Sequence, residues 1–150
     1  MADQTRTKGS NSPNDWRLLA EDDLAIAEHI TANMNPIPTT GAAFHCQQAV
    51  EKFLKGAITI FGDEPPFIHD LDKLCSFAEK HRPSFVGISS LYTAINYFSV
   101  QPRYDRGISL SDEDLRLVLS HTKTIKEFLQ KEMPELFRDE NNQTGMIGAC

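Results

Sequence analysis

The chain has few cysteines, and their placement excludes two classes of small protein. Only Cys46, Cys75 and Cys150 occur among its 150 residues. An odd number without C-x-x-C spacing indicates neither a disulfide framework nor a cysteine-rich zinc site. No second histidine stands at metal-ligand spacing from His69. We therefore predict no metal ion and no cofactor.

Long apolar runs are also missing. No stretch approaches the length needed to cross a bilayer, and residues 1–6 lack the apolar core of a signal peptide. The expected location is cytoplasmic, without membrane contact.

Basic residues are too few for a broad nucleic-acid surface. The formal net charge is −6, whereas non-specific nucleic-acid binding needs clustered Lys and Arg. A small local basic site remains compatible with this charge. The length, with 40 % hydrophobic and 24 % charged residues, is ordinary for one globular domain.

The clearest pattern is a helix over residues 44–61. At 100° per residue its apolar positions share one broad face, which comprises Cys46, Ala49, Val50, Phe53, Leu54, Ala57, Ile60 and Phe61. Gln48, Glu51, Lys52 and Lys55 follow the spacing i, i+3, i+4, i+7 on the other side. We predict that these four project outward as one polar ridge, in which Glu51 and Lys55 form an i, i+4 ion pair.

The helix before it should run from a cap at Asn14 or Asp15 to about Met34. Its predicted buried stripe is Trp16, Leu19, Ala20, Ile26, Ala27, Ile30 and Met34. Asp23 falls inside this stripe, where a carboxylate needs a partner. One interpretation is a structural ion pair, with Lys52 or Arg103 as first candidates, and the other places Asp23 in a polar site.

Three more helices complete the predicted fold. A short one follows His69 and the N-cap Asp70 to about residue 80, one runs from residue 89 or 90 to about 100, and one runs from 111 to about 131. No strand pattern or internal repeat is visible. The fold class is therefore all-α, an antiparallel four-helix bundle with one additional short helix. The domain spans residues 14–137, between a disordered lead-in (1–13) and a disordered tail (138–150).

Three motifs resemble the signature of the HEPN domain. They are Gln48-Ala49-x-Glu51-Lys52-x-Leu54-Lys55 followed by Gly62, then Pro66-x-x-His69-Asp70-Leu71 with Leu74, and finally Tyr97 with Arg103-Tyr104-Asp105. The family usually has proline where this chain has Asp105. The resemblance covers roughly residues 14–135 and implies a small helical domain.

Two of these motifs leave alternatives open. His69 either tethers its loop by hydrogen-bonding to backbone or to a neighbouring carboxylate, or faces a ligand beside the polar ridge. Arg103 and Tyr104 either grip a phosphate or stack on a base, or belong to a salt-bridged loop.

Many HEPN proteins are metal-independent ribonucleases that use an Arg followed four to six residues later by His. Arg116 and His121 match this spacing, with His moving the proton and Arg stabilising charge. On one continuous helix, however, the two lie about 140° apart. A dimer could bring such groups together, because His121 shares a lateral strip with Leu117 and Phe128.

The resemblance favours a non-catalytic module that binds a nucleotide or a partner minimal nucleotidyltransferase, as in toxin–antitoxin or stress-response pairs. The expected ligand-binding residues are Gln48, Glu51, Lys52, Lys55, His69, Arg103 and Tyr104. The alternatives are a ribonuclease using Arg116 and His121, and a homodimerising bundle without ligand.

Overall fold

The computed structural model describes residues 11–104 and 110–138, without the side chains of 100–104. The helices are α2 (Pro13–Asn33), α3 (Thr39–Ile60), α4 (Leu71–His81), α5 (Ser89–Tyr104) and α6 (Asp112–Glu132), with 3-10 turns η1 (Pro83–Ile88) and η2 (Pro134–Phe137). No strand occurs in these ranges. The predicted all-α bundle of four longer helices and one short one is confirmed.

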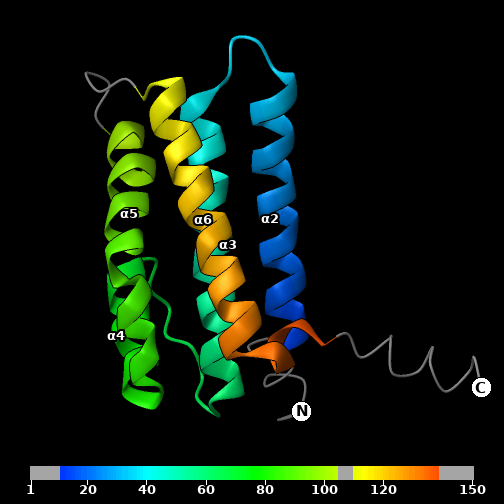
Figure 1. Ribbon diagram of the computed structural model, residues 1–150, viewed down its shortest axis with the longest axis vertical. Coiled ribbons are helices and arrows are strands. Elements are labelled where there is room, and N and C mark those ends of the chain that lie inside the picture. The colour runs from blue at the N-terminus through cyan, green and yellow to red at the C-terminus, as the bar shows by residue number, and fades with distance from the viewer. Residues whose placement is uncertain (1–10, 105–109, 139–150) are drawn as a thin grey trace, which may run out of the picture.

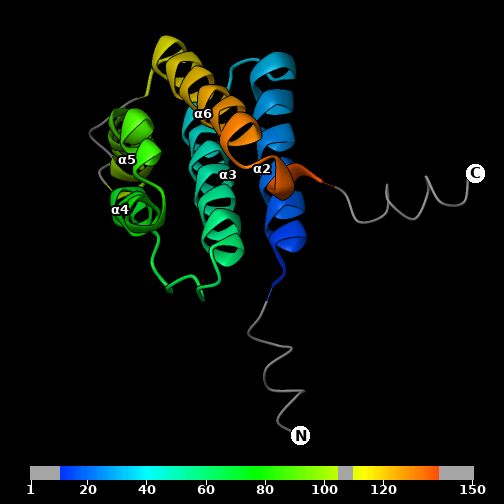
Figure 2. The same ribbon diagram turned by 60° about the horizontal axis from the view of Figure 1, so that its bottom comes forward.

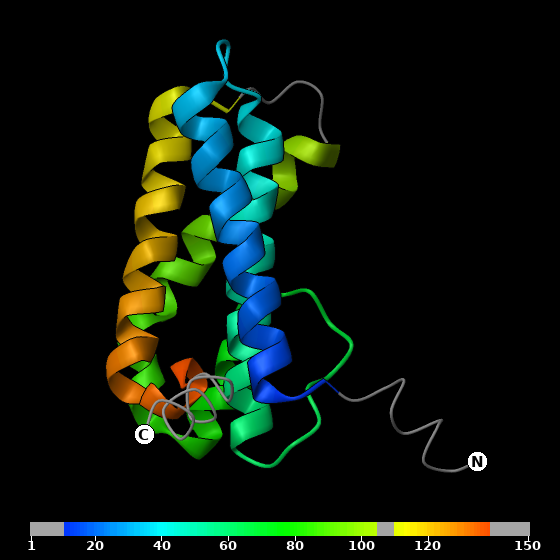
Figure 3. The same ribbon diagram turned by 90° about the vertical axis from the view of Figure 1, so that its right-hand side faces the viewer.

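The central helix α3 contacts every other α-helix of the bundle. It runs antiparallel to α2, and α6 runs antiparallel to α5 (Figure 1). Turning the molecule shows α4 and α5 grouped on the opposite side of α3 from α2 (Figure 2). The loop between α3 and α4 swings out beside the first turn of α2 (Figure 3). This loop brings His69 back to the central helix.

The apolar face predicted for α3 forms the centre of the core. Cys46, Ala49, Val50, Phe53, Leu54 and Ala57 are fully buried, and Ile60 and Phe61 are half-buried at the helix end. Gly62 follows with a φ of 94°, a left-handed conformation that glycine adopts without steric cost. The helix predicted over residues 44–61 ends at Ile60, with Phe61 as its C-cap.

The predicted start of the first helix was wrong. Ser12 caps α2: its hydroxyl accepts from the Asp15 amide at 3.1 Å, and the Asp15 carboxylate accepts from the Ser12 amide at 2.9 Å. Pro13 is the first helical residue, where its fixed φ suits the helix. The domain therefore begins before residue 14. Thr39 opens α3 without capping it, because its hydroxyl donates to the Leu110 carbonyl at 2.8 Å.

The stripe predicted for α2 was partly wrong. Leu19 and Ile26 are each 41 % exposed and Met34 is 49 % exposed, whereas the buried side of the helix comprises Arg17, Ala20, Asp23, Leu24 and Ala27. Small residues at Ala20 and Ala27 suit close helix packing. Leu19, Ile26 and Met34 therefore lie outside the buried side of α2, to which Leu24 belongs.

Two other expectations concern the end of α5 and the chain termini. That helix continues to Tyr104, past the predicted end near residue 100. The predicted disordered segments lie largely outside the described residues.

Within the described ranges, no helix combines the length and apolarity that a membrane crossing requires.

Candidate functional site

The polar ridge of α3 does not project into solvent. Glu51 and Lys55 are 4 % and 5 % exposed, and Gln48 and Lys52 are half-buried. The prediction of an outward ridge was therefore wrong. These side chains are covered because the α3–α4 loop packs against this side of the helix. His69 of the loop contacts Gln47 and Glu51 of α3. The periodicity of α3 alone does not indicate that another segment packs on its polar side.

Glu51 is the centre of one set of polar contacts on this side of α3. Its carboxylate accepts from Lys55 Nζ at 3.1 Å, which confirms the predicted i, i+4 ion pair. His69 Nδ1 lies 3.1 Å from both carboxylate oxygens. The Gln47 amide donates to the His69 carbonyl at 2.9 Å and its oxygen accepts from Gln48 at 2.8 Å.

His69 thus does what the tethering interpretation predicts. It bonds a neighbouring carboxylate and holds the loop to α3. Its side chain is nevertheless 80 % exposed, so the ring also faces the surroundings. Tethering and ligand contact are compatible in this geometry.

Asp23 is the centre of a second, separate set of polar contacts. Lys52 Nζ lies 2.5 Å from one carboxylate oxygen and His45 Nδ1 lies 2.8 Å from the other. Asp23 therefore forms an ion pair, and Lys52 is one of the two partners considered for it from sequence. His45 was missed, although it precedes Lys52 by seven residues and therefore shares its helix face.

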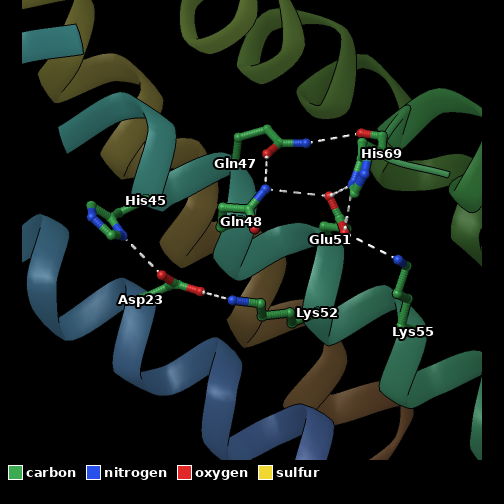
Figure 4. Close-up of polar contacts among 8 residues, drawn as sticks. All are labelled: Asp23, His45, Gln47, Gln48, Glu51, Lys52, Lys55 and His69. Carbon is green, nitrogen blue, oxygen red and sulfur yellow. Dashed lines mark hydrogen bonds and ion pairs between the residues drawn. The ribbon is translucent and has the colours of Figure 1, made fainter. Parts of the chain in front are cut away.

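These eight residues form what we call the polar cluster: Asp23, His45, Gln47, Gln48, Glu51, Lys52, Lys55 and His69 (Figure 4). Its two carboxylates are the inner groups, with side chains 11 % and 6 % exposed for Asp23 and Glu51. Three basic groups are more exposed: Lys52 at 23 %, His45 at 28 % and His69 at 80 %. Because an ammonium has three donors, Lys52 retains donors after bonding Asp23. Lys52 can therefore present oriented N–H groups to an anion, and His45 and His69 can do so from Nε2 when the imidazole is protonated.

A hollow of about 170 Å³ adjoins the cluster where the α3–α4 loop passes the start of α2. It is lined by Asn11, Trp16, Lys55, Glu64, Pro65, Pro66 and Phe67. Lys55 belongs to both features, since its Nζ lies 5.6 Å from the centre of the Trp16 ring. This hollow was not predicted from the sequence. The one signal for it was the Pro65-Pro66-Phe67 segment, which places an apolar ring in a loop.

The predicted catalytic pair does not come together. Arg116 and His121 lie on one continuous helix, α6, so about 140° separates them around its axis. Arg116 is exposed in a shallow hollow with Leu119, Ser120, Lys123, Thr124 and Glu127, and His121 does not line it.

Arg103 and Tyr104 are the last residues of α5, and their side chains lie outside the described residues. Their predicted contacts stay predictions.

The buried thiols are chemically quiet. Burial raises the pKa of Cys46 and of Cys75 to about 12 in each case. Neither thiol carries a nucleophilic thiolate near neutral pH. Among the described residues, no three His, Cys, Asp or Glu side chains gather as a metal ion would require.

The bundle and its central polar helix define a small α-helical domain with a buried charge network on one side. The family model of the HEPN domain matches residues 13–133. The chain belongs to the HEPN domain family. No curated protein matches it, and no solved structure does.

Proposed function

We propose that this chain is a non-catalytic HEPN module that binds a nucleotide at the polar cluster. Lys52, His45 and His69 contact the phosphate. Asp23 and Glu51 hold these groups in place from beneath. The family resemblance supports the ligand class.

The observation that carries this proposal is a set of basic side chains oriented by buried carboxylates. Burying charge is unfavourable unless the pair is well bonded, and apolar residues would stabilise the same positions as well or better. Buried charges in the middle of the central helix, where apolar residues would be at least as stable, suit a binding role. Oriented donors also lose little conformational freedom when an anion arrives.

The position of Arg116 supports the non-catalytic part. A ribonuclease would need Arg116 and His121 to contact one phosphate. Within one protomer, α6 directs them to different sides. We therefore expect no ribonuclease activity in metal-free buffer. Activity that disappears in both Arg116→Ala and His121→Ala would establish the enzyme instead.

Thermal unfolding with AMP tests the binding role. A ligand that binds only the folded state at ten times its Kd stabilises it by about 1.4 kcal/mol, which corresponds to roughly 3–5 °C. We expect this shift in the wild type and in Lys123→Ala, and its loss in Lys52→Ala. Lys123 is a matched control because it also pairs with a carboxylate, Glu28, but lies on α6. No shift at millimolar AMP contradicts the proposal.

A second candidate function is docking to a protein. Leu19 and Ile26, both 41 % exposed, lie on α2 four residues before and three after Asp23, so they flank the cluster on one helix strip. Such a strip fits a partner, by resemblance a minimal nucleotidyltransferase of a toxin–antitoxin or stress-response pair, or a second copy. Light scattering of the chain, alone and with the product of the neighbouring reading frame, tests this. A complex should weaken in Leu19→Glu and persist in Val86→Glu, whose valine is 58 % exposed on η1.

A further inference from the structure

We propose that the hollow beside Trp16 is the base subsite of the nucleotide bound at the polar cluster. This inference rests on the proposed function and adds to it where the heterocycle lies. The base stacks on the ring of Phe67, beside Trp16.

The first observation is an aromatic ring presented to solvent. The side chain of Phe67 is 98 % exposed on the rim of the hollow, so nearly all of its apolar ring area faces water. Pro65 and Pro66 precede it and restrict the backbone of this loop. A flat heterocycle that covers Phe67 would remove this exposed apolar area.

The second observation is an aromatic wall. Trp16 lines the hollow together with Lys55, whose Nζ lies 5.6 Å from the centre of the Trp16 ring. Trp16 Cβ packs against Gly56 of α3, where an added Cβ would stand 3.2 Å from it. The hollow therefore has one aromatic side chain in its wall and another, Phe67, on its rim.

The third observation is the size and position of the hollow. At about 170 Å³ it is smaller than the roughly 300–1,000 Å³ of pockets that enclose whole ligands. It suits one ring system, with the rest of the ligand outside. Lys55 lines it, and Lys52 lies three residues earlier, about 4.5 Å along the helix axis. A base in the hollow therefore leaves its phosphate within reach of Lys52.

The single tryptophan of the chain makes this subsite measurable. We would titrate the full chain with AMP, adenosine and ribose 5-phosphate, and follow both Trp16 fluorescence and calorimetric heat. AMP and adenosine should change the fluorescence saturably. Phe67→Ala should weaken both at least fivefold, because stacking on an aromatic side chain is worth about that or more per base, and should leave ribose 5-phosphate unchanged.

Tyr97→Ala is the matched control, since Tyr97 is 59 % exposed on α5 and does not line the hollow. It should bind all three ligands like the wild type. If AMP binds and Lys52→Ala weakens it, but Phe67→Ala binds AMP normally, the base subsite is refuted and the proposed function stands. If adenosine depends on Phe67 but Lys52→Ala leaves AMP unaffected, the subsite is supported and the phosphate site fails. No heat with any ligand overturns both.

Discussion

The buried ion pair of Glu51 and Lys55 gives the sharpest prediction about stability. Their side chains are 6 % and 7 % exposed and their charged atoms lie 3.1 Å apart. Removing one partner of such a pair leaves a buried charge uncompensated and typically costs 3–5 kcal/mol. We therefore expect Glu51→Gln to lower the free energy of unfolding by about 3 kcal/mol or more. For a chain of this size the melting temperature should fall by roughly 10 °C.

Urea denaturation of wild type, Glu51→Gln, Lys55→Met and the double variant would measure this. The double variant removes both charges, so it should be destabilised by less than the sum of the single variants. The matched control is Glu28→Gln, because Glu28 and Lys123 form a pair at 3.0 Å with side chains 45 % and 50 % exposed. It should cost less than about 1 kcal/mol. If Glu51→Gln costs no more than Glu28→Gln, or if the four variants are additive, the reasoning from burial is refuted.

Three further predictions follow from packing, capping and burial. Gly56→Ala should lower the free energy of unfolding by about 1–3 kcal/mol in urea denaturation, because an added Cβ would meet Leu136 Cδ1 at 2.9 Å. Gly41→Ala, where the added Cβ would have no atom within 4 Å, should raise it by about 0.5–1 kcal/mol. Equal effects of the two substitutions would contradict the packing at Gly56. Ser12→Ala should cost about 1 kcal/mol by loss of the α2 cap, whereas Ser76→Ala within α4 should not be destabilising. In a Cys150→Ser background, Cys46 and Cys75 should resist a thiol reagent at pH 8 until the protein unfolds, because a pKa of about 12 keeps both thiols protonated at pH 8. Rapid labelling of the native protein would contradict their burial.

The parts of the fold that helical periodicity determines were predictable. The apolar face of α3 is buried along most of its length, as its pattern indicates. The short helix predicted after Asp70 forms as α4 and buries Leu71, Leu74, Cys75 and Ala78. It was predictable that Asp23 needs a partner, because a carboxylate inside an apolar stripe does. Lys52 was one of two candidates, and the sequence did not decide between Lys52 and Arg103. Ser12 was missed because Pro13 looked like the end of an irregular segment rather than the first residue of a helix.

The direction of the polar ridge was not predictable in the same way. A helical wheel shows that Glu51 and Lys55 share a side, but it does not show which other segment covers that side. The cover comes from the α3–α4 loop, whose His69 contacts Glu51 across 18 residues of sequence. Leu19 and Ile26 illustrate the reverse case. They looked buried by their apolar character, and the position of the neighbouring helices leaves them half exposed.

A titration with AMP followed by two-dimensional NMR tests the central claim most directly, because it locates the ligand on the surface. We predict that the largest shifts fall on Lys52, His45 and His69, while Arg116 and its neighbours on α6 stay unchanged. Shifts centred on Arg116 and His121, or no shifts at millimolar AMP, would contradict a nucleotide site at the polar cluster.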